Sequence, residues 1–578
     1  MERTGEGGIP DLAARAALAT QALVSLRDEA VGGLLYFDVQ YDREPAVAVH
    51  SPWDYGDGTG RHLDALVLAH VLTSLPEALD VAFDLAGLLM SWQGEMGLIW
   101  WPPEPWTAPG WTNDMRRLRD WEPGQRVAEI AWAQRGALMG LTSLYVLTGE
   151  DRYRASARRI VDGLNTVALG SSNYAFFPEI AYRSGGWQYT AEPITDGTSE
   201  WTCASSFPLL RFYAATGYEP ALNLAGRMIH FILHRAHGFE QDGSFHETTG
   251  FWSHFHSKSA TITAIILYGL LAGQPEYVAW GRQAYEAAKV WGTDFGWFPE
   301  DLRNFRRCET CGITDMIEAA LLLGLHVSPS FLDDAQKYGR NHLLESQLLS
   351  TAGITRIPRS LGRQPAHLED PRAYTDRDVV QRALGSFAGW SAPNDFFDEG
   401  RFSGMGCCNA AGTRALYDLW HHAVDDDGET ARVHMAFSRA CTWGDLSTAE
   451  PFSGGLAVHL KAPRRLAVRI PGWTVRTEVQ AHVNGAPARA ECRGQYLWLE
   501  GLQAGDTVRI SYPTPISMRS YVLGENTYVA NYRGDTIFSI SPRGRFLPLY
   551  ERDYYLSAQA PETDLSTSSR VHEIRSIC

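Results

Sequence analysis

GALMGLTSLYVLTGEDRYRASARRIVDGL, residues 136–164, combines an apolar helical stretch, a short turn at Gly149 and a second helix with a polar face. The same pattern returns at 205–233 and 260–288, and weaker copies lie at 60–90, 313–344 and 411–440. A first helix that is apolar nearly all round and a second with one polar face are typical of the inner and outer helices of a double ring. We therefore expect six helix pairs that close into an (α/α)6 barrel.

The connections between these pairs are long and rich in Trp, His, Asp and Glu, whereas the turns within a pair are short. Long loops without their own secondary structure are usually functional. In the expected barrel they all lie on the face where the inner helices begin. That face is therefore the predicted location of the site.

The hydrophobic period changes to two after about residue 445, in GLAVHLKAP, RLAVRIPGW, QYLWLEGL and DTVRISYP. Alternation of this kind with Gly, Pro and Asn-Gly punctuation predicts strands and hairpins. We expect a mainly α protein, with a barrel domain at 1–440, a C-terminal antiparallel β-sandwich at 441–555 and a polar tail at 556–578.

The composition excludes several classes of partner. The chain has 578 residues and a net charge of −16, from 51 Lys and Arg against 67 Asp and Glu, so nucleic acid or an anionic membrane is not an expected ligand. No long apolar run suggests a leader or a membrane span, and the eight cysteines are sparse, so we expect a cytoplasmic protein with reduced thiols. Loop tryptophans among carboxylates suit a carbohydrate partner. The oligomeric state stays open.

Two groups of cysteines each precede an expected inner helix. Cys308-Glu309-Thr310-Cys311 comes before ITDMIEAALLLG, and the glycine-flanked pair Cys407-Cys408 comes before AGTRALYDLW. A glycine-flanked turn lets two adjacent sulfurs face one point. Glu309, Cys311, Cys407 and Cys408 would then suit tetrahedral zinc, and the alternative is a set of buried, inert thiols.

These two groups, followed by RLAVRIPGW, VNG, YLWLEGLQAGDTVRISYP and NYRGDTIFSISPRG, resemble glycoside hydrolase family 127, the β-L-arabinofuranosidase family, over roughly residues 30–552. The resemblance implies an (α/α)6 barrel with β-sandwich domains. It also implies hydrolysis with retention of anomeric configuration, by a cysteine nucleophile that zinc holds. Glu309, Cys311 and Cys408 match the zinc ligands, and Cys407 matches the ligand that is also the nucleophile.

The general acid is where this chain departs from the family. The family has a glutamate sixteen residues before the E-T-C glutamate, and Thr293 stands at that place here. Asp294 and Glu300 are the nearby candidates for the proton donor, although both also fit solvated loop carboxylates. Loss of the acid could also mean an altered substrate or an inactive enzyme.

Polar residues in the long loops are candidates for sugar contacts, and for each of them a structural or solvent-facing role is the alternative. His254 and His256 flank a phenylalanine just before an expected inner helix. The other candidates are Asp54, Asp57, Arg61, Glu200, Trp201 and His246.

Two further functions stay open at this stage. A polysaccharide lyase can use the same architecture with a Tyr or His base, and the four metal-site residues would then be dispensable. A non-catalytic carbohydrate-binding protein with purely structural zinc is the other alternative, since four-ligand zinc is typical of structural sites.

Overall fold

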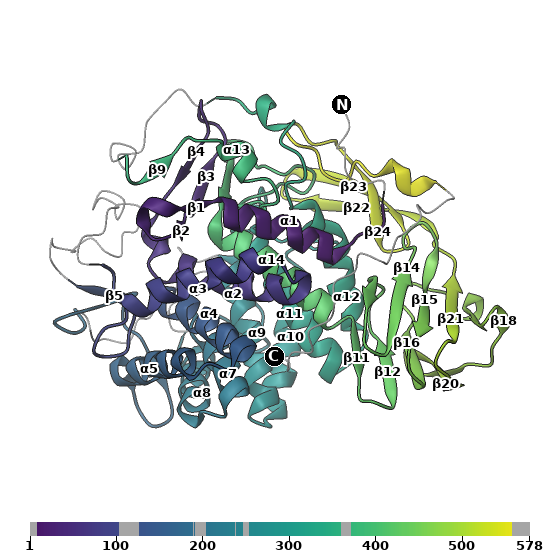
Figure 1. Ribbon diagram of the computed structural model, residues 1–578, viewed down its shortest axis with the longest axis horizontal. Helices are drawn as coiled ribbons and strands as arrows, with labels where there is room; N and C mark the ends of the chain where they lie inside the picture. Colours follow the sequence, from purple (N-terminus) through teal and green to yellow (C-terminus); the bar gives the residue numbers. More distant parts are fainter. Residues whose placement is uncertain are drawn as a thin grey trace.

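A computed structural model describes residues 8–102, 126–188, 190, 204–236, 238–246, 254–359 and 371–557. Helices make up most of the chain up to His421, and strands make up most of the rest. In Figure 1 the helices occupy one side of the molecule and the C-terminal strands the other. The protein is therefore mainly helical with a sheet-rich C-terminal region.

The first helices of the six repeats are buried along almost their whole length, as their apolar sequences predict. Each contacts the next, and the last returns to the first, so that the six form a closed cycle. In order they are α2 (Asp57–Thr73), α4 (Ala133–Thr148), α7 (Ser206–Thr216), α9 (Phe255–Leu271), α11 (Thr310–His326) and α14 (Gly406–His421).

Second helices follow five of these six helices and bury only one face. They are α3 (Pro76–Ser91), α5 (Asp151–Val167), α8 (Glu219–His234), α10 (Pro275–Lys289) and α12 (Phe331–Tyr338), which a short π-helical segment at Gly339–Leu343 extends. The N-terminal helix α1 (Leu12–Ser25) packs against α14 and α2 and takes the sixth place.

The prediction of a second helix in the 411–440 repeat is wrong. This segment forms the strands β11 (Val424–Asp426), β12 (Thr430–Val433) and β13 (Arg439–Ala440). β12 pairs with β16, which buries Ala431 and Val433 in the C-terminal core. The change from helix to sheet therefore falls just after α14.

Close packing of α2 against α4 depends on glycine. A Cβ atom at Gly60 would lie 2.0 Å from the carbonyl carbon of Gly136, and one at Gly136 would lie 2.5 Å from the carbonyl oxygen of Asp57. No side chain fits at these points, so the two backbones touch. This contact fixes the start of α2, which carries Asp57 and Arg61.

The C-terminal region contains three sheets. The first has the order β11-β12-β16-β20-β19, with β16 at Arg464–Arg469, β20 at Tyr496–Leu502 and β19 at Glu491–Arg493. The second has the order β13-β14-β15-β21-β17-β18, with β14 at Gly444–Thr448, β15 at Gly454–Leu460, β21 at Thr507–Tyr512, β17 at Gln480–Val483 and β18 at Ala486–Pro487. The third joins β22 (Ile516–Leu523), β23 (Asn526–Arg533) and β24 (Thr536–Ser541).

Alternating apolar residues of the first two sheets belong to one buried cluster, which includes Val458 from β15 and Val468 from β16. The predicted alternation is thus confirmed. The predicted antiparallel pairing has one exception, because β12 and β16 run parallel.

Buried ion pairs join the C-terminal sheets to the helical part. Arg340, after α12, pairs with Glu450 and lies 3.2 Å from Asp535. Arg552 pairs with Glu345 at 2.7 Å. All five side chains are almost completely buried, so these ion pairs are shielded from bulk solvent.

A four-stranded sheet assembles from segments that lie far apart in the sequence, in the order β10-β3-β4-β9. Its strands are β10 (Ser403–Met405), β3 (Asp38–Gln40), β4 (Val47–Val49) and β9 (Tyr374–Thr375). β10 leads directly into α14, so this sheet fixes the place where Cys407 and Cys408 emerge.

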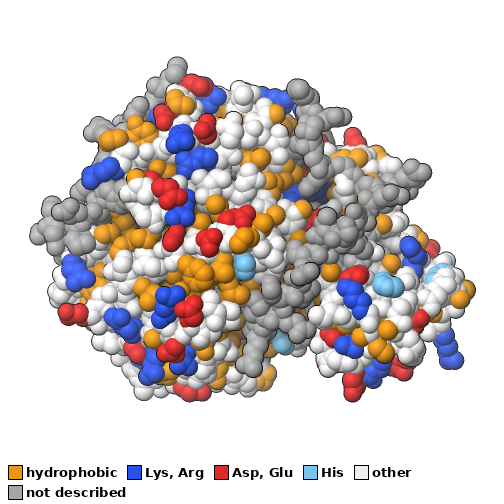
Figure 2. Space-filling model, in the orientation of Figure 1, with side chains coloured by type: hydrophobic (Ala, Val, Ile, Leu, Met, Phe, Trp, Pro, Cys, Tyr) orange, Lys and Arg blue, Asp and Glu red, His pale blue; other side chains and the backbone are white. Residues whose placement is uncertain are grey.

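The remaining short elements are β1 (Arg27–Asp28), β2 (Leu34–Leu35), β5 (Val127–Glu129), β6 (Leu169–Gly170), β7 (Ala175–Phe176), β8 (Ala181–Arg183) and α13 (Val379–Arg382). Among the described residues, no helix combines the length and apolar character that crossing a membrane needs. The face in Figure 2 mixes acidic and basic side chains.

Candidate functional site

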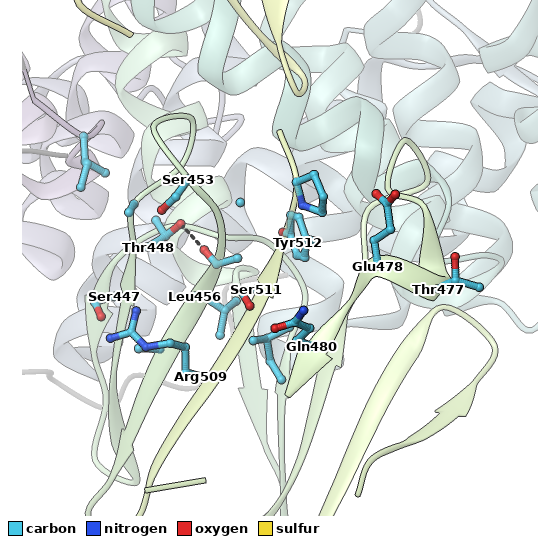
Figure 3. A pocket seen from close by; sticks show the side chains of 17 residues that line it. Ser447, Thr448, Ser453, Leu456, Thr477, Glu478, Gln480, Arg509, Ser511 and Tyr512 are labelled. Carbon is cyan, nitrogen blue, oxygen red and sulfur yellow. Dashed lines mark hydrogen bonds between the residues drawn. The ribbon is translucent and has the colours of Figure 1, made fainter. Parts of the chain in front are cut away.

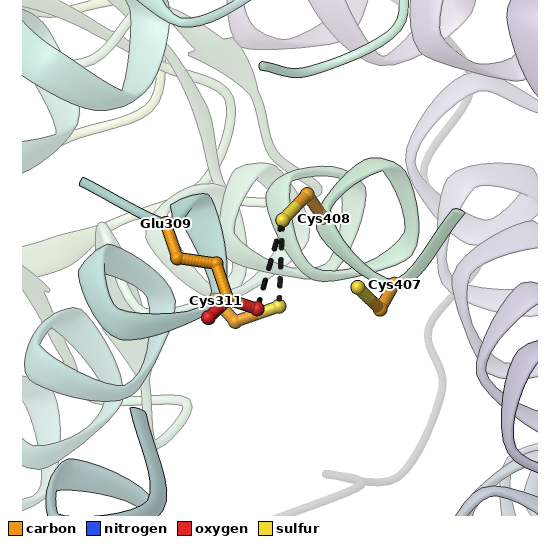
Figure 4. A group of neighbouring side chains, drawn as sticks. All are labelled: Glu309, Cys311, Cys407 and Cys408. Atoms are coloured by element: carbon orange, nitrogen blue, oxygen red, sulfur yellow. Dashed lines mark hydrogen bonds between the residues drawn. The ribbon is translucent and has the colours of Figure 1, made fainter. Parts of the chain in front are cut away.

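Four side chains converge where α11 and α14 begin, and we call them the Cys3Glu cluster: Glu309, Cys311, Cys407 and Cys408 (Figure 4). Their ligand atoms all lie within 4.8 Å of one another, and all four residues are buried. Cys408 Sγ lies 3.8 Å from Cys311 Sγ and 3.9 Å from Glu309 Oε1. The structure thus brings together the four residues that the sequence predicts as metal ligands.

The spacing of the Cys3Glu cluster fits a tetrahedral metal ion. Zinc–sulfur bonds of about 2.3 Å at tetrahedral angles separate two sulfurs by about 3.8 Å. The Cys311–Cys408 separation has this value. Three sulfurs and one carboxylate are a donor set suited to zinc.

The four side chains of the Cys3Glu cluster affect one another's ionisation. Burial raises the pKa of Cys311, but hydrogen bonds with Cys407 and Cys408 and the charge of Arg61 outweigh it, so that pKa lies well below the usual value. The hydrogen bond to Cys311 raises the pKa of Cys407, and burial raises the pKa of Cys408 and of Glu309. A divalent cation bound by the cluster would favour the ionised form of the thiols.

Glu309 is held in place from outside the cluster. His254 Nε2 lies 2.7 Å from Glu309 Oε2, and His254 Nδ1 lies 3.0 Å from the Ser257 hydroxyl. The other carboxylate oxygen, Oε1, faces Cys408. Such outer partners orient ligands and tune their basicity. His254 therefore acts on the cluster through Glu309.

Arg61 supplies a buried positive charge beside the cluster. Its Nη2 donates to Cys311 Sγ at 3.2 Å, and its Nη1 lies 3.9 Å from Asp57. Burial alone would lower the pKa of Arg61, but the nearby Cys311 and Asp57 raise it well above its usual value. Arg135 holds Asp57 from the other side at 3.2 Å. The guanidinium thus stabilises a thiolate on Cys311.

Comparison with known proteins bears on the fold. No protein-family profile and no curated relative matches the chain. Among solved structures, the chain resembles a GH127 β-L-arabinofuranosidase from Geobacillus stearothermophilus T6 at 15% identity, with a TM-score of 0.53 over 90% of this chain and 80% of the other. A second GH127 β-arabinofuranosidase matches at 12% identity, with a TM-score of 0.57 over 91% and 81%.

A third structure, described as a glycoside hydrolase, matches at 13% identity, with a TM-score of 0.55 over 89% of this chain and 84% of the other. The chain therefore shares the fold of these three structures. At this level of identity the likeness concerns the fold alone, so the chemistry must be argued from the residues.

His256 lines a small cavity of about 30 Å³, together with Arg61, Arg135 and Arg414. Its Nδ1 lies 2.6 Å from Asp315 Oδ2. Its Nε2 is buried and has no hydrogen-bond partner within the part of the chain that the structure describes. His256 is therefore available to bind a polar group that enters this cavity.

The other predicted sugar contacts that the structure describes have protein partners. Asp54 Oδ2 lies 2.8 Å from His50 Nδ1, and Asp57 pairs with Arg135. His246 Nδ1 lies 2.5 Å from Glu240. Glu200 and Trp201 lie outside the described residues. The sugar-binding role of all these residues stays a prediction.

The three residues considered for proton transfer lie in different surroundings. Thr293 is buried, and its hydroxyl both donates to the carbonyl of Trp297 and accepts from the Trp297 amide, so it caps a turn. Asp294 accepts from Arg519 and from Tyr521 of β22. Glu300 pairs with Arg307 at 2.5 Å.

These partners bear on which residue could donate a proton. Burial raises the pKa of Asp294, but Lys337, Tyr521 and Arg519 lower it below its usual value. An ionised Asp294 that binds the C-terminal sheet is a poor proton donor. The assignment of Asp294 or Glu300 as the acid stays a prediction.

A larger hollow of about 830 Å³ lies on the six-stranded sheet (Figure 3). Its described lining residues include Thr448, Glu478, Arg509 and Tyr512, but neither Cys nor His. It offers one carboxylate and no paired acid and nucleophile. The Cys3Glu cluster is therefore the stronger candidate for a catalytic or metal site, although this hollow is larger.

Sequence patterns missed several neighbours of the cluster. Phe37 and Cys407 belong to one buried group, against which Trp53 and Met405 pack. Phe37 directly precedes β3, which pairs with the nearby β4 and with the remote β10. The pairing with β10, which brings Phe37 to the cluster, leaves no local signal in the sequence.

Proposed function

We propose that this chain is a retaining glycoside hydrolase of the family 127 type, whose Cys3Glu cluster holds zinc. The closed cycle of six helices is then the inner layer of an (α/α)6 barrel, and the two larger C-terminal sheets form a β-sandwich. The observation that carries the proposal is the convergence of Glu309, Cys311, Cys407 and Cys408 within 4.8 Å, at the start of two inner helices.

Cys407 is the nucleophile in this proposal. Its side chain belongs to the first turn of α14, and the residue is 9% exposed, whereas Cys311 and Cys408 are fully buried. Cys407 is therefore the least buried of the three cysteines. Zinc, when bound, would keep the sulfurs ionised near neutral pH.

The reaction has two steps. The Cys407 sulfur attacks the anomeric carbon, and the bond from that carbon to the leaving oxygen breaks while a carboxylic acid protonates the oxygen. Water then attacks the same carbon, the resulting carboxylate accepts the water proton, and Cys407 leaves as a thiolate. Two displacements at one carbon retain its configuration.

The substrate class in this proposal is a carbohydrate with an accessible furanosidic or related sugar. Buried His256, with a ring nitrogen that no described residue occupies, would bind a sugar hydroxyl, and Arg61 and Arg135 line the same cavity. A β-L-arabinofuranoside is the first substrate to test.

One alternative has an observation in its favour. All four donors are buried, and a complete four-donor set is typical of structural zinc. A carbohydrate-binding protein with structural zinc would bind sugar without turning it over.

Trapping the intermediate tests the proposal. The protein is mixed with 4-nitrophenyl β-L-arabinofuranoside and quenched during turnover, and its intact and peptide masses are measured. We expect one added glycosyl group on the peptide that contains Cys407, and a first product with retained configuration by NMR. Sugar binding without turnover supports the structural-zinc alternative, and a product that absorbs in the ultraviolet supports a lyase.

A further inference from the structure

Strand β3 is attached to the backbone that leads into Cys407. Asp38 pairs directly with Met405 in the antiparallel ladder between β3 and β10, and Met405 precedes Cys407 by two residues. The Gly406 amide donates to the Phe37 carbonyl oxygen at 2.5 Å. Directly opposed residues of such a ladder have Cα atoms about 4.5–5.5 Å apart. Asp38 is therefore fixed close to the start of α14.

The side chain of Asp38 shares a sheet face with that of Met405, because opposed residues of an antiparallel pair project to the same side. Met405 packs against the buried group that contains Phe37 and the three sulfurs of the Cys3Glu cluster. Asp38 itself is only partly buried. Asp38 therefore shares a sheet face with a residue that packs against the cluster.

Unlike three other acidic candidates, Asp38 has a side chain without a partner in the described part of the chain. Asp54 binds His50, Asp294 binds Arg519, and Glu300 binds Arg307. The side chain of Asp38 makes no hydrogen bond or ion pair with any residue that the structure describes. Asp38 lies on the strand that pairs with the segment leading into Cys407, and a carboxyl group without a structural partner is free to serve a substrate.

The charges around Asp38 favour its protonated form. Burial, and then the negative charge of Asp54, raise the pKa of Asp38 to about 7. Other titratable groups on the neighbouring elements include His50, which binds both Asp54 and Asp28. They also include Asp57, Arg61 and His62 of α2, and the thiol of Cys407. A carboxylic acid that stays protonated near neutral pH can donate a proton in one step and accept one in the next.

We infer that Asp38 is the general acid and base of this glycoside hydrolase. The inference rests on the proposed function. It supplies the proton donor that is missing at position 293, where the family glutamate is replaced by Thr293. In the first step the Asp38 proton passes to the leaving oxygen as the bond between sulfur and carbon forms. In the second step the Asp38 carboxylate takes a proton from the attacking water, and Cys407 departs as a thiolate. The sum is a glycoside plus water giving a sugar and an alcohol.

The test compares leaving groups in Asp38→Asn. The substrates are phenyl and 4-nitrophenyl β-L-arabinofuranoside, and the matched control is Asp42→Asn, in the turn that follows β3. We expect kcat/KM of Asp38→Asn to fall about 10²–10⁴-fold with the phenyl substrate. The loss with 4-nitrophenyl should be far smaller, because that leaving group needs no proton. Asp42→Asn should behave like the wild type.

A second readout separates an acid from a residue that only supports the fold. Wild-type kcat/KM for the phenyl substrate should fall as the pH rises through the pKa of Asp38, and Asp38→Asn should lack this decline. Azide should accelerate the variant on the 4-nitrophenyl substrate and give a glycosyl azide, because a small anion needs no general base. If Asp38→Asn does not fold, the azide test is made on Asp38→Ala.

The outcomes distinguish this inference from the proposed function. Equal losses on both substrates, or no azide effect, contradict the role of Asp38 while Cys407-dependent turnover remains. A wild type without turnover, or a Cys407→Ser variant with full turnover, contradicts the proposed function itself.

Discussion

At the scale of the residue, Cys407 decides whether the site is catalytic or structural. It shares the cluster with two fully buried cysteines and is itself 9% exposed. A serine oxygen at this position replaces the sulfur with little change in volume. We expect Cys407→Ser to lower kcat by more than about 10³-fold. Turnover of a 4-nitrophenyl glycoside and the melting temperature are measured together.

The melting temperature supplies the other half of that prediction. A nucleophile can be removed with only a small loss of stability, so the variant should unfold within a few degrees of the wild type. A variant that is mainly destabilised, with unchanged sugar binding, would support structural zinc instead.

Replacement of His254 tests how a residue outside the Cys3Glu cluster affects zinc binding. The Nε2 atom of His254 holds one oxygen of Glu309 at 2.7 Å and leaves the other for the metal. We expect His254→Ala to weaken zinc binding by about 10–100-fold, as removal of such outer partners typically does. Zinc affinity is measured by competition with a coloured chelator. His246→Ala, which removes a half-exposed histidine bound to Glu240, is the control and should leave the affinity unchanged.

At the scale of the element, the contact between α2 and α4 positions Arg61. An added Cβ at Gly60 would lie 2.0 Å from backbone atoms of α4, so the helices must separate. We expect Gly60→Ala to lower the free energy of unfolding by about 1–3 kcal/mol. Calorimetry measures the change in melting temperature.

Gly87 provides a matched control on α3. A Cβ there meets no atom within 4 Å, so Gly87→Ala should be neutral or stabilise the helix by up to about 1 kcal/mol. Equal effects of the two substitutions would contradict the close helix contact.

Local patterns predicted the helices well and their partners less well. The five complete helix pairs follow from apolar periodicity and from turn glycines such as Gly149, which adopts φ +70. The sixth failed because ETARVHMAF has enough apolar residues for a helix face, yet pairs with a strand of the sandwich region. Nothing local shows that α1 would fill the sixth place.

The site was predictable where residue chemistry is unusual and not where ordinary residues meet. Three cysteines and a glutamate before two helices stand out in any sequence. Asp38, in contrast, lies between Phe37 and Val39 and has the pattern of a solvent-facing strand residue. Its proximity to Cys407 arises from the pairing of β3 with β10, which are separated by more than 300 residues.

At the scale of the whole molecule, buried ion pairs connect the C-terminal sheets to the helices. Arg340 is 2% exposed and faces Glu450 and Asp535. Removing one member of a buried pair leaves an uncompensated charge. We expect Arg340→Met to destabilise the protein by about 3–5 kcal/mol.

Arg543→Met is the control for Arg340→Met, because it removes an exposed ion pair instead of a buried one. The pair of Arg543 with Glu551 is largely exposed, so Arg543→Met should cost less than about 1 kcal/mol. Denaturant unfolding of both variants checks the difference, and similar small losses would mean that the buried network contributes little.

The most direct test of the account is zinc content per chain, measured by elemental mass spectrometry on protein purified under reducing conditions. Wild type is compared with Cys311→Ala and with Cys308→Ala, whose cysteine is buried next to the cluster but outside it. The account predicts one zinc per chain in wild type and in Cys308→Ala, and none in Cys311→Ala. A wild type without zinc, or zinc that survives in Cys311→Ala, would contradict it.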